Sequence, residues 1–456
     1  MFFNNKKSEE KEEKIIKEET SKEKFVISNY AMERYKKSQH YKNTDLTNEE
    51  IELLFCDKSI GYKKSETNFQ RVFSKLIKNE KGYHWIVFPP KYQHKSELDD
   101  RFFNCIFYEG SFQGNALWFK DCEFDKIEGT TNSFISFKVE KDIYFYNVQS
   151  NIHFLLNKCL SIKISKSNLY DLEITKSEIK QIDKINLEKV RLKSIYINHY
   201  NIQKLSMTDL IVEPQGKFDL HSHIIEEIYI DNLDLSNIKS DISLYTKDIK
   251  NLTIYNSTLP TFFNFDIIAE NCYIQTSTIE FDRDCFNIRN KNLDLNIHKS
   301  KLVFNTEHNF LEIKCKKLSL DNINIEKKLM LYNINEFTCL NSNIQNIDFS
   351  NKIDEIYIYN SIVKEEINLS FLKSKECFIN KSILNISNFK FASINKLAIY
   401  KSSFKELDFD CSFINEARFV QVKGLNEENE EEELSDKHFA SKESLNYFKT
   451  ITNEKE

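Results

Sequence analysis

Residues Cys377 to Gly424 read CFINKSILNISNFKFASINKLAIYKSSFKELDFDCSFINEARFVQVKG, and this stretch decides the fold. Large apolar residues recur in it at every fifth position, namely Ile379, Leu384, Phe389, Ile394, Ile399, Phe404, Phe409, Ile414 and Phe419. Two residues before each stands a second, mostly small residue: Cys377, Ser382, Ser387, Ala392, Leu397, Ser402, Leu407, Ser412 and Ala417. Neither the helical period of 3.6 nor the strand period of 2 produces fives. The spacing predicts a square coil with five residues on each side and two inward side chains per side.

The inward pair has a simple physical basis. The centre of a narrow coil has room for one large and one small side chain per side, each stacked on the same pair in the next coil. A single coil cannot bury its apolar side alone, so coils must stack into a quasi-one-dimensional rod. A large residue at a small position would overfill the core, at a cost of about 1–3 kcal/mol.

The fives also occur near Arg101, where Phe102, Phe107, Phe112 and Leu117 are five apart. Between these two regions a looser pattern persists. Apolar residues stand at its first, third and eighth positions, often with Ser at the sixth, as in Leu252/Ile254/Ser257/Leu259 and Ile356/Ile358/Ser361/Val363. The pattern recurs at intervals near 20 residues, which is one coil of four fives. About 320 residues give about 16 coils, and stacking at roughly 4.8 Å predicts a rod of about 75 Å.

This pattern resembles the pentapeptide-repeat family of right-handed quadrilateral β-helices, whose motif is roughly Ala/Cys/Ser, x, Leu/Phe, x, x. The segments Arg101 to Phe124 and Cys377 to Phe419 carry the match, and the repeats between them are degenerate. The resemblance implies a right-handed parallel β-solenoid and transfers no catalytic residue. Members of the family include gyrase-protecting DNA mimics, effectors and membrane-associated proteins.

The fold class we predict is mainly β, a right-handed parallel β-solenoid of about 20-residue coils, with a small α+β cap before it and a helix after it. The expected divisions are a disordered charged tail at 1–26, a helical or α+β cap at 27–100, a solenoid of pentapeptide-like repeats at 101–424, an acidic linker at 425–436 and a C-terminal helix at 437–456 that lies over the last coil.

Two motifs support a helical N-terminal cap. Thr47 and Glu50 form a predicted capping box before an apolar run. Phe69, Val72 and Phe73 begin an apolar stripe at helical spacing. After them, residues 83–88 are expected to form a strand that Pro89 and Pro90 end. An open solenoid end exposes unpaired backbone, so a cap is needed there.

Composition narrows the setting. The net charge of −6 gives no basic footprint for nucleic acid and is modest for DNA mimicry. Ten cysteines are irregularly spaced without a CxxC pair, and four of them, Cys105, Cys122, Cys272 and Cys377, occupy small inward positions. We therefore expect buried reduced thiols and a cytoplasmic location. The polar N-terminus predicts no signal peptide, and no apolar run is long enough to span a membrane.

The sharpest local cluster is Asp219, His221 and His223, which alternation places on one side of a strand. His-x-His is a geometry that holds zinc, but no distant third ligand is identifiable, so we expect a polar outward surface and assign no metal. Two carboxylate pairs, Asp282/Asp284 and Asp408/Asp410, are expected to point into water rather than across a cleft.

Four tyrosines, Tyr229, Tyr255, Tyr357 and Tyr400, lie between inward positions and should face outward. If coils stack in register, these tyrosines form either a ladder for a protein partner or routine cross-coil contacts.

The sequence thus favours a non-enzymatic cytoplasmic scaffold that presents a solenoid surface to a protein partner of unknown identity, without catalytic residues or cofactors. One alternative is an inhibitor of a nucleic-acid enzyme that acts by DNA mimicry. Another makes the chain the cytosolic part of a membrane-associated assembly, attached through the C-terminal helix.

Overall fold

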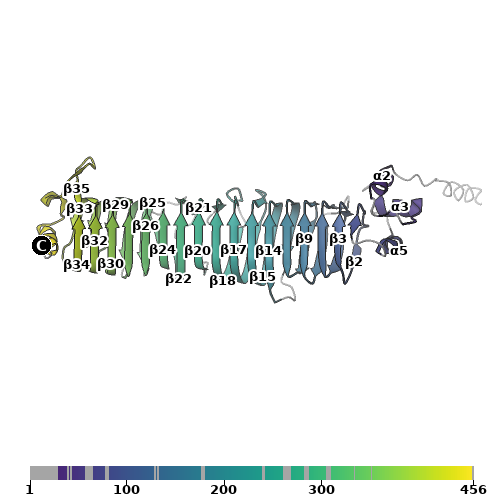
Figure 1. The fold of residues 1–456 in the computed structure, drawn as a ribbon, viewed down its shortest axis with the longest axis horizontal. Helices are drawn as coiled ribbons and strands as arrows, with labels where there is room; N and C mark the ends of the chain where they lie inside the picture. The colour runs from purple at the N-terminus through teal and green to yellow at the C-terminus, as the bar shows by residue number, and fades with distance from the viewer. Residues whose placement is uncertain are drawn as a thin grey trace, which may run out of the picture.

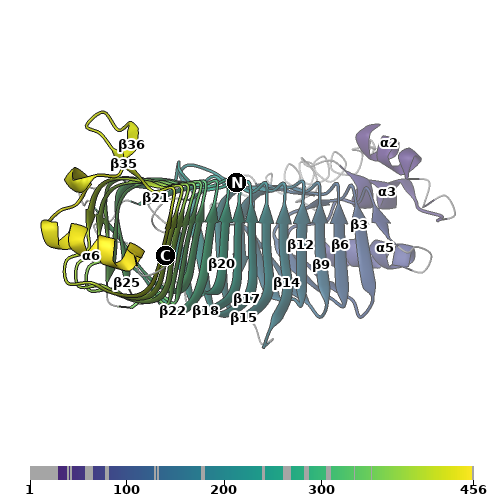
Figure 2. The same ribbon diagram turned by 60° about the vertical axis from the view of Figure 1, so that its left-hand side comes forward.

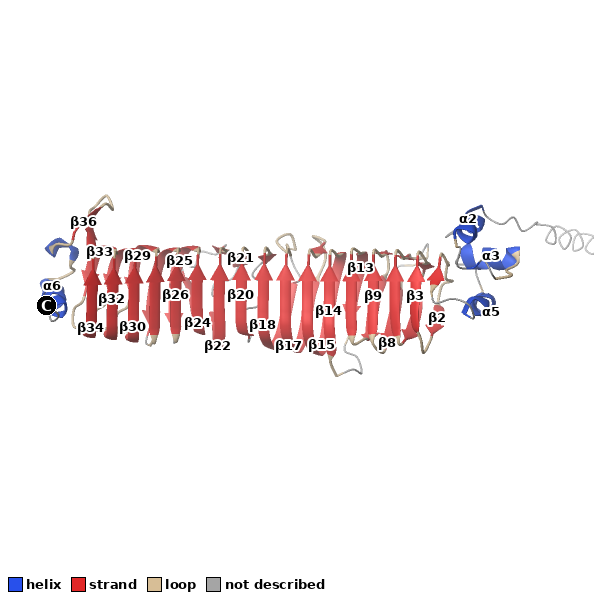
Figure 3. Ribbon diagram, viewed as in Figure 1, coloured by secondary structure: helices blue, strands red, loops and turns tan. Residues whose placement is uncertain are grey.

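The protein is a long β-solenoid with helices at both ends (Figure 1). The computed structural model describes residues 29–453 except 39–40, 42–43, 57–64, 78–81, 128–129, 131–132, 176–179, 239–241, 260–268, 282–286, 305–309, 333 and 351. About 15 turns are present, close to the 16 coils expected from the spacing. Strands make up 60% of the chain and helices 12%, and Figure 3 shows how these classes are divided between the rod and its ends. The expected tail at 1–26 lies outside the described residues.

In the described part of the chain, all strands belong to one 36-stranded sheet that winds around the rod. The first strands are β1 (Tyr83–His84), β2 (Tyr92–Lys95), β3 (Asp99–Phe103), β4 (Ile106–Phe107), β5 (Gly110–Gly114), β6 (Ala116–Lys120), β7 (Glu123–Phe124), β8 (Phe134–Val139), β9 (Asp142–Tyr146), β10 (Gln149–Ser150), β11 (His153–Lys158), β12 (Ser161–Ser165), β13 (Asn168–Ile174) and β14 (Ile182–Glu188). In the middle follow β15 (Arg191–Thr208), β16 (Ile211–Val212), β17 (Phe218–Asp231), β18 (Ile242–Tyr255), β19 (Thr258–Leu259), β20 (Ala269–Gln275), β21 (Thr278–Phe281), β22 (Asn287–His298), β23 (Lys301–Phe304) and β24 (Phe310–Asp321).

The C-terminal coils contain β25 (Asn324–Tyr332), β26 (Glu336–Leu340), β27 (Asn343–Ser350), β28 (Glu355–Tyr359), β29 (Ile362–Asn368), β30 (Lys373–Asn380), β31 (Ile383–Asn388), β32 (Ser393–Tyr400), β33 (Ser403–Asp408), β34 (Phe413–Val420) and β35 (Lys423–Leu425). Pairing between coils is parallel, and Lys373 aligns with Ser393, which aligns with Phe413. Each step is twenty residues, so the strict fives of the sequence produce an equally strict coil.

The stack starts earlier than the fives suggested. Strand β1 pairs in parallel with β3, and β2 pairs in parallel with β5. Residues 83–95, which we expected in the cap, therefore lie in the coil stack. The strand expected over 83–88 is interrupted at Trp85, whose φ of 65° turns the chain after β1.

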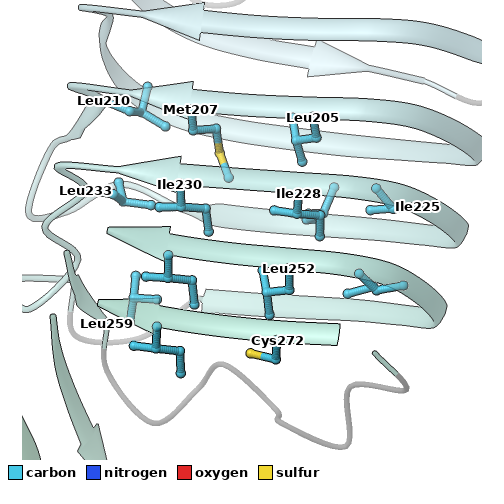
Figure 4. Close-up of a cluster of buried hydrophobic side chains, with 14 of the residues drawn as sticks. Leu205, Met207, Leu210, Ile225, Ile228, Ile230, Leu233, Leu252, Leu259 and Cys272 are labelled. Atoms are coloured by element: carbon cyan, nitrogen blue, oxygen red, sulfur yellow. The ribbon is translucent and has the colours of Figure 1, made fainter. Parts of the chain in front are cut away.

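The core is a continuous column of inward side chains along the rod. Figure 4 shows a section of it, in which Leu205, Ile228 and Leu252 stack from coil to coil, and Cys272 occupies the next step. The four cysteines predicted at small inward positions are all buried, which confirms that the thiols fill apolar space there. Burial raises the pKa of the Cys272 and Cys377 thiols to about 12. These thiols are therefore neutral and unreactive in the folded protein.

One corner of the coil is turned by a single residue in left-handed conformation, once in every turn. The sixteen residues with φ between 46° and 55° in this column are Asn104, Asp121, Asn147, Lys166, Lys189, Asp209, Asn232, Asn256, Thr276, Lys299, Asn322, Asn341, Asn360, Lys381, Lys401 and Gln421. Asparagine is the commonest among them, because it adopts this conformation more readily than most residues. This explains why a chain with only seven glycines can turn so often.

The serine that recurs in the degenerate repeats follows directly after this corner. Each hydroxyl donates to the carbonyl two residues earlier, at 2.5–2.9 Å, and accepts an N–H from the same corner of the preceding coil, at 3.1–3.2 Å. The serines are Ser167, Ser257, Ser277, Ser300, Ser342, Ser361, Ser382 and Ser402. Cys105 and Cys122 hold the same position, and their thiols contact the corresponding carbonyls at 3.4 Å. The repeat therefore uses Ser or Cys for hydrogen bonding as well as for size.

Replacing one serine of this ladder should destabilise the rod. In Ser382→Ala the buried N–H of Ser361 loses its acceptor, and we expect the free energy of unfolding to fall by about 1–3 kcal/mol. Ser382→Cys should lose less, because a thiol fills this position elsewhere in the chain. Urea unfolding followed by circular dichroism measures both, with the exposed Ser393→Ala as the control. Equal stability of Ser382→Ala and the control would show that the ladder contributes nothing.

The N-terminal cap contains α2 (Asn29–Lys37), α3 (Asn48–Phe55) and α5 (Glu66–Ile77). Thr47 caps α3 and forms the predicted capping box with Glu50. The stripe on α5 is buried as predicted, and Phe69 and Phe73 pack on Phe88 and Tyr92 of the first coil.

The C-terminal helix α6 (Lys442–Asn453) lies across the open end of the last coil, as Figure 2 shows, and confirms the predicted C-terminal helix. Ahead of it, the segment expected to be an acidic linker contains β36 (Glu431–Glu433), which pairs antiparallel with β35. A short helix, η2 (Asp436–His438), follows and brings the buried His438 to within 2.8 Å of Glu432. The glutamates thus belong to a hairpin. The Asn426 side-chain oxygen closes its turn by accepting the N–H groups of Glu428 and Glu430.

Candidate functional site

The predicted His-x-His cluster is on β17, and its three side chains alternate outward as expected. Asp219 and His221 form a pair at 2.6 Å, but His223 stacks instead on the ring of Tyr200, with centroids 4.7 Å apart. The structure therefore joins two of the three residues and directs the third to a different neighbour. Over the described part of the chain, no group of three or more His, Cys, Asp or Glu side chains converges on a point where a metal could bind.

Of the two carboxylate pairs, the structure describes Asp408 and Asp410. Asp282 and Asp284 lie outside the described residues. Asp408 accepts the backbone N–H of Asp410 at 2.9 Å, and Asp410 accepts a hydrogen bond from Ser441 ahead of α6. Both carboxylates are thus only partly exposed and stabilise the last corner and its cap.

The four predicted tyrosines are half-buried on the outer surface and form two separate groups. Tyr255 contacts both Tyr229 and Tyr273, with ring centroids 5.7 Å apart in each pair. Near the C-terminus, Phe378 lies between Tyr357 and Tyr400, at 6.4 and 5.4 Å. Tyr229 aligns with Thr253, whereas Tyr255 aligns with Asp231, so neighbouring tyrosines stand in adjacent columns. These contacts are tilted cross-coil packing and leave no continuous row.

A different aromatic feature is far more exposed. Phe371 and Phe391 stand at the corner that precedes β30 and β32, and their rings stack at 5.0 Å with an interplanar angle of 16°. They are 66% and 45% exposed, and both have left-handed backbone, with φ of 59° and 57°. Cys411 occupies the same corner one coil later, with φ of 52°, and is the one exposed thiol among the described cysteines. We call Phe371, Phe391 and Cys411 the aromatic ledge.

Beside the ledge runs a shallow groove of about 390 Å³ across four coils. It is lined by Lys352, Asp354, Lys373, Ser374, Lys375, Ser393, Ile394, Asn395, Phe413 and Asn415, and we call it the C-terminal groove. Phe413 is 65% exposed. Ser374 aligns with Ile394 and Ile414, so a small residue occupies a position that the next coils fill with isoleucine.

The groove is positively charged overall. The Nζ atoms of Lys352 and Lys375 are each 3.2 Å from the Asp354 carboxylate. Burial disfavours the charged form of Asp354, but hydrogen bonds from these lysines outweigh burial and lower the pKa of the carboxyl below its ordinary value. Asp354 is therefore ionised at neutral pH and fixes two cationic side chains at the rim, while Lys373 lies between them in the sheet.

Sequence reasoning missed this site because it followed the inward phase. Phe371, Phe391 and Phe413 are out of phase with the large residues that recur every five positions. This mismatch was the signal in the sequence, because a large aromatic side chain at an outward position cannot pack in the core.

No protein-family model matches the chain, and no curated protein or solved structure is similar to it at a significant level. Among the described helices, none has the length and apolar character needed to cross a membrane.

Proposed function

We propose that the chain is a non-enzymatic scaffold of pentapeptide-like repeats that binds another protein through the aromatic ledge and the C-terminal groove. The observation that carries this proposal is the pair of exposed phenylalanines in left-handed conformation. Such backbone costs about 1–2 kcal/mol for a residue with a side chain. Exposure also forgoes the burial of a large apolar ring. Left-handed backbone and exposure of an apolar ring are both unfavourable, and their recurrence in consecutive coils supports a role in binding.

Two further observations support the same role. The groove is open and shallow, which suits a macromolecular surface better than a small substrate that must be enclosed. None of the nine described cysteines forms a disulfide bond, and eight are buried, which supports a reducing, cytoplasmic setting for the scaffold.

The test uses Cys411 as an attachment point beside the rings. The full chain carries Cys285→Ser, because Cys285 lies outside the described residues, and is labelled at Cys411 with a benzophenone maleimide. It is mixed with extract of its native cells and irradiated, and cross-linked proteins are identified by mass spectrometry. We expect one protein to be captured, and Phe371→Asn/Phe391→Asn to reduce its yield at least tenfold. The control carries Cys411→Ser with Phe134→Cys, which moves the label to an exposed position far along the rod.

Asparagine at positions 371 and 391 should leave the fold intact. It accepts left-handed backbone more readily than phenylalanine, so relief of about 1 kcal/mol of strain at each position offsets the loss of the ring contact. We therefore expect the free energy of unfolding of the double variant to be unchanged or slightly higher. The proposed function would be contradicted if the same protein were captured equally from positions 134 and 411, or if Phe371→Asn/Phe391→Asn left the yield of captured protein unchanged.

A further inference from the structure

We propose that the segment bound in the C-terminal groove is an extended, acidic stretch of the partner protein that places a large apolar side chain against the aromatic ledge. This inference rests on the proposed function and specifies the chemistry of the partner. It follows from three properties of the site: its charge, its length and its position on the rod.

The groove and ledge form a basic island on an acidic protein. Lys352, Lys373 and Lys375 line the groove, and Lys390 lies 5.8 Å from the ring of Phe391. Against these four lysines stand two carboxylates, Asp354 and Asp410, so the site carries a charge of about +2 by this count. The whole chain carries −6. A segment rich in Glu or Asp is attracted to this site and repelled by the chain as a whole, which favours binding in one place.

The dimensions of the site suit an extended chain. Lys352, Lys373, Ser393 and Phe413 are aligned in four successive coils. Three steps of about 4.8 Å span about 14 Å, the length of roughly four extended residues. Phe413 closes one end of this line, and the stacked rings of Phe371 and Phe391 border it. A segment with acidic residues over the lysines can therefore also bury an apolar side chain on the phenylalanines.

The surroundings favour an acidic protein segment over an anionic membrane. The groove lies at the start of β30, β32 and β34, whereas the hairpin of β35 and β36 projects from the opposite side of the rod (Figure 1). A flat bilayer would contact a long side of a rod whose net charge is −6, and not the basic site alone. A single extended segment can contact the groove alone.

The experiment measures fluorescence anisotropy with the full chain and three labelled peptides of about ten residues. The first has six glutamates and two phenylalanines, the second has serine in place of phenylalanine, and the third has glutamine in place of glutamate. We expect the first to bind at least tenfold more tightly than either of the others. Its affinity should fall at least tenfold in Lys373→Glu/Lys375→Glu and in Phe371→Asn/Phe391→Asn. The control Lys163→Glu reverses an exposed charge on β12, far from the groove, and should change the affinity less than twofold.

The outcomes separate this inference from the proposed function. If no peptide binds but the cross-linked partner at Cys411 is retained, the acidic segment is wrong and the scaffold stands. Absence of both peptide binding and cross-linking contradicts both proposals. Equal binding of the first and second peptides would overturn the role of the ledge. Vesicles of phosphatidylcholine with phosphatidylserine form the last arm: sedimentation that requires Lys373 and Lys375, without peptide binding, would replace the protein partner by a membrane.

Discussion

Asp100→Ala should destabilise the N-terminal end of the rod by about 3–5 kcal/mol, because it leaves Nε2 of the buried His94 without its partner. The Asp100 carboxylate is 2.7 Å from Nε2 of His94, and the two residues are 8% and 5% exposed. Asp100 aligns with Leu117, and His94 aligns with Phe112. The first full coil therefore places a polar pair where the next coil has two apolar side chains. Around the pair lie the rings of Tyr83, Tyr92 and Phe102. The Tyr92 hydroxyl lies 3.4 Å from Nδ1 of His94, so it cannot replace Asp100 at Nε2, and that nitrogen is left buried without a partner.

The matched control restores the apolar pair. In His94→Phe/Asp100→Leu, both positions carry the residues of the next coil, and we expect a stability equal to or higher than that of the natural chain. Both tryptophans, Trp85 and Trp118, lie at this end, so their fluorescence during urea unfolding reports on these coils directly. The measurement must be local, because a repeat rod need not unfold as one unit. A loss below 1 kcal/mol in Asp100→Ala would show that the pair is not important for the end coil.

The strict repeat made the last coils of the rod predictable. Ile379, Leu384, Phe389 and their successors at intervals of five are buried as far as Ile414, since the same packing problem recurs in every coil. Phe419, in the final coil, is partly buried and packs on Phe448 of α6. In the middle, the recurring serine preserved the phase although the apolar positions drifted, because its hydroxyl bonds the backbone after half of the sixteen left-handed corners. Physical constraints that repeat leave a signal even in a degenerate sequence.

What could not be predicted depends on contacts between segments far apart in sequence. Nothing near Asp100 indicates that His94 faces it, and the fives begin one residue later. The glutamates after Gly424 look like a solvated linker, yet β36 forms because β35 offers it a free edge. The aromatic ledge is visible as an out-of-phase pattern, but its stacking and left-handed backbone arise only when consecutive corners align.

The second large effect is expected at the other end, where Phe409→Ala should release the C-terminal helix and destabilise the last coils by about 3–5 kcal/mol. Phe409 is fully buried, stacks on Phe389 at 4.8 Å and contacts Phe448 of α6 at 6.2 Å. Its truncation leaves a cavity that involves both the coil and the cap. Hydrogen exchange of residues 442–453 should become at least a hundredfold faster. Phe349→Ala creates a similar cavity within the rod and should leave exchange in α6 unchanged.

The reason is that the cap substitutes for the next coil. The N–H of Phe409 donates to Ser444 Oγ at 2.7 Å, and the N–H of Ile414 donates to Tyr447 Oη at 2.8 Å. The N–H of Ala440 in turn donates to the carbonyl of Leu407. Without α6 these groups and the apolar end of the core are exposed, and an uncovered parallel edge is a template for pairing with another chain. Phe409→Ala should therefore associate at concentrations where the natural chain and Phe349→Ala keep their size, as light scattering after size exclusion would show. If Phe409→Ala kept both its size and slow exchange in α6, the polar contacts alone would hold the cap, and Ser444→Ala would be the variant that releases it.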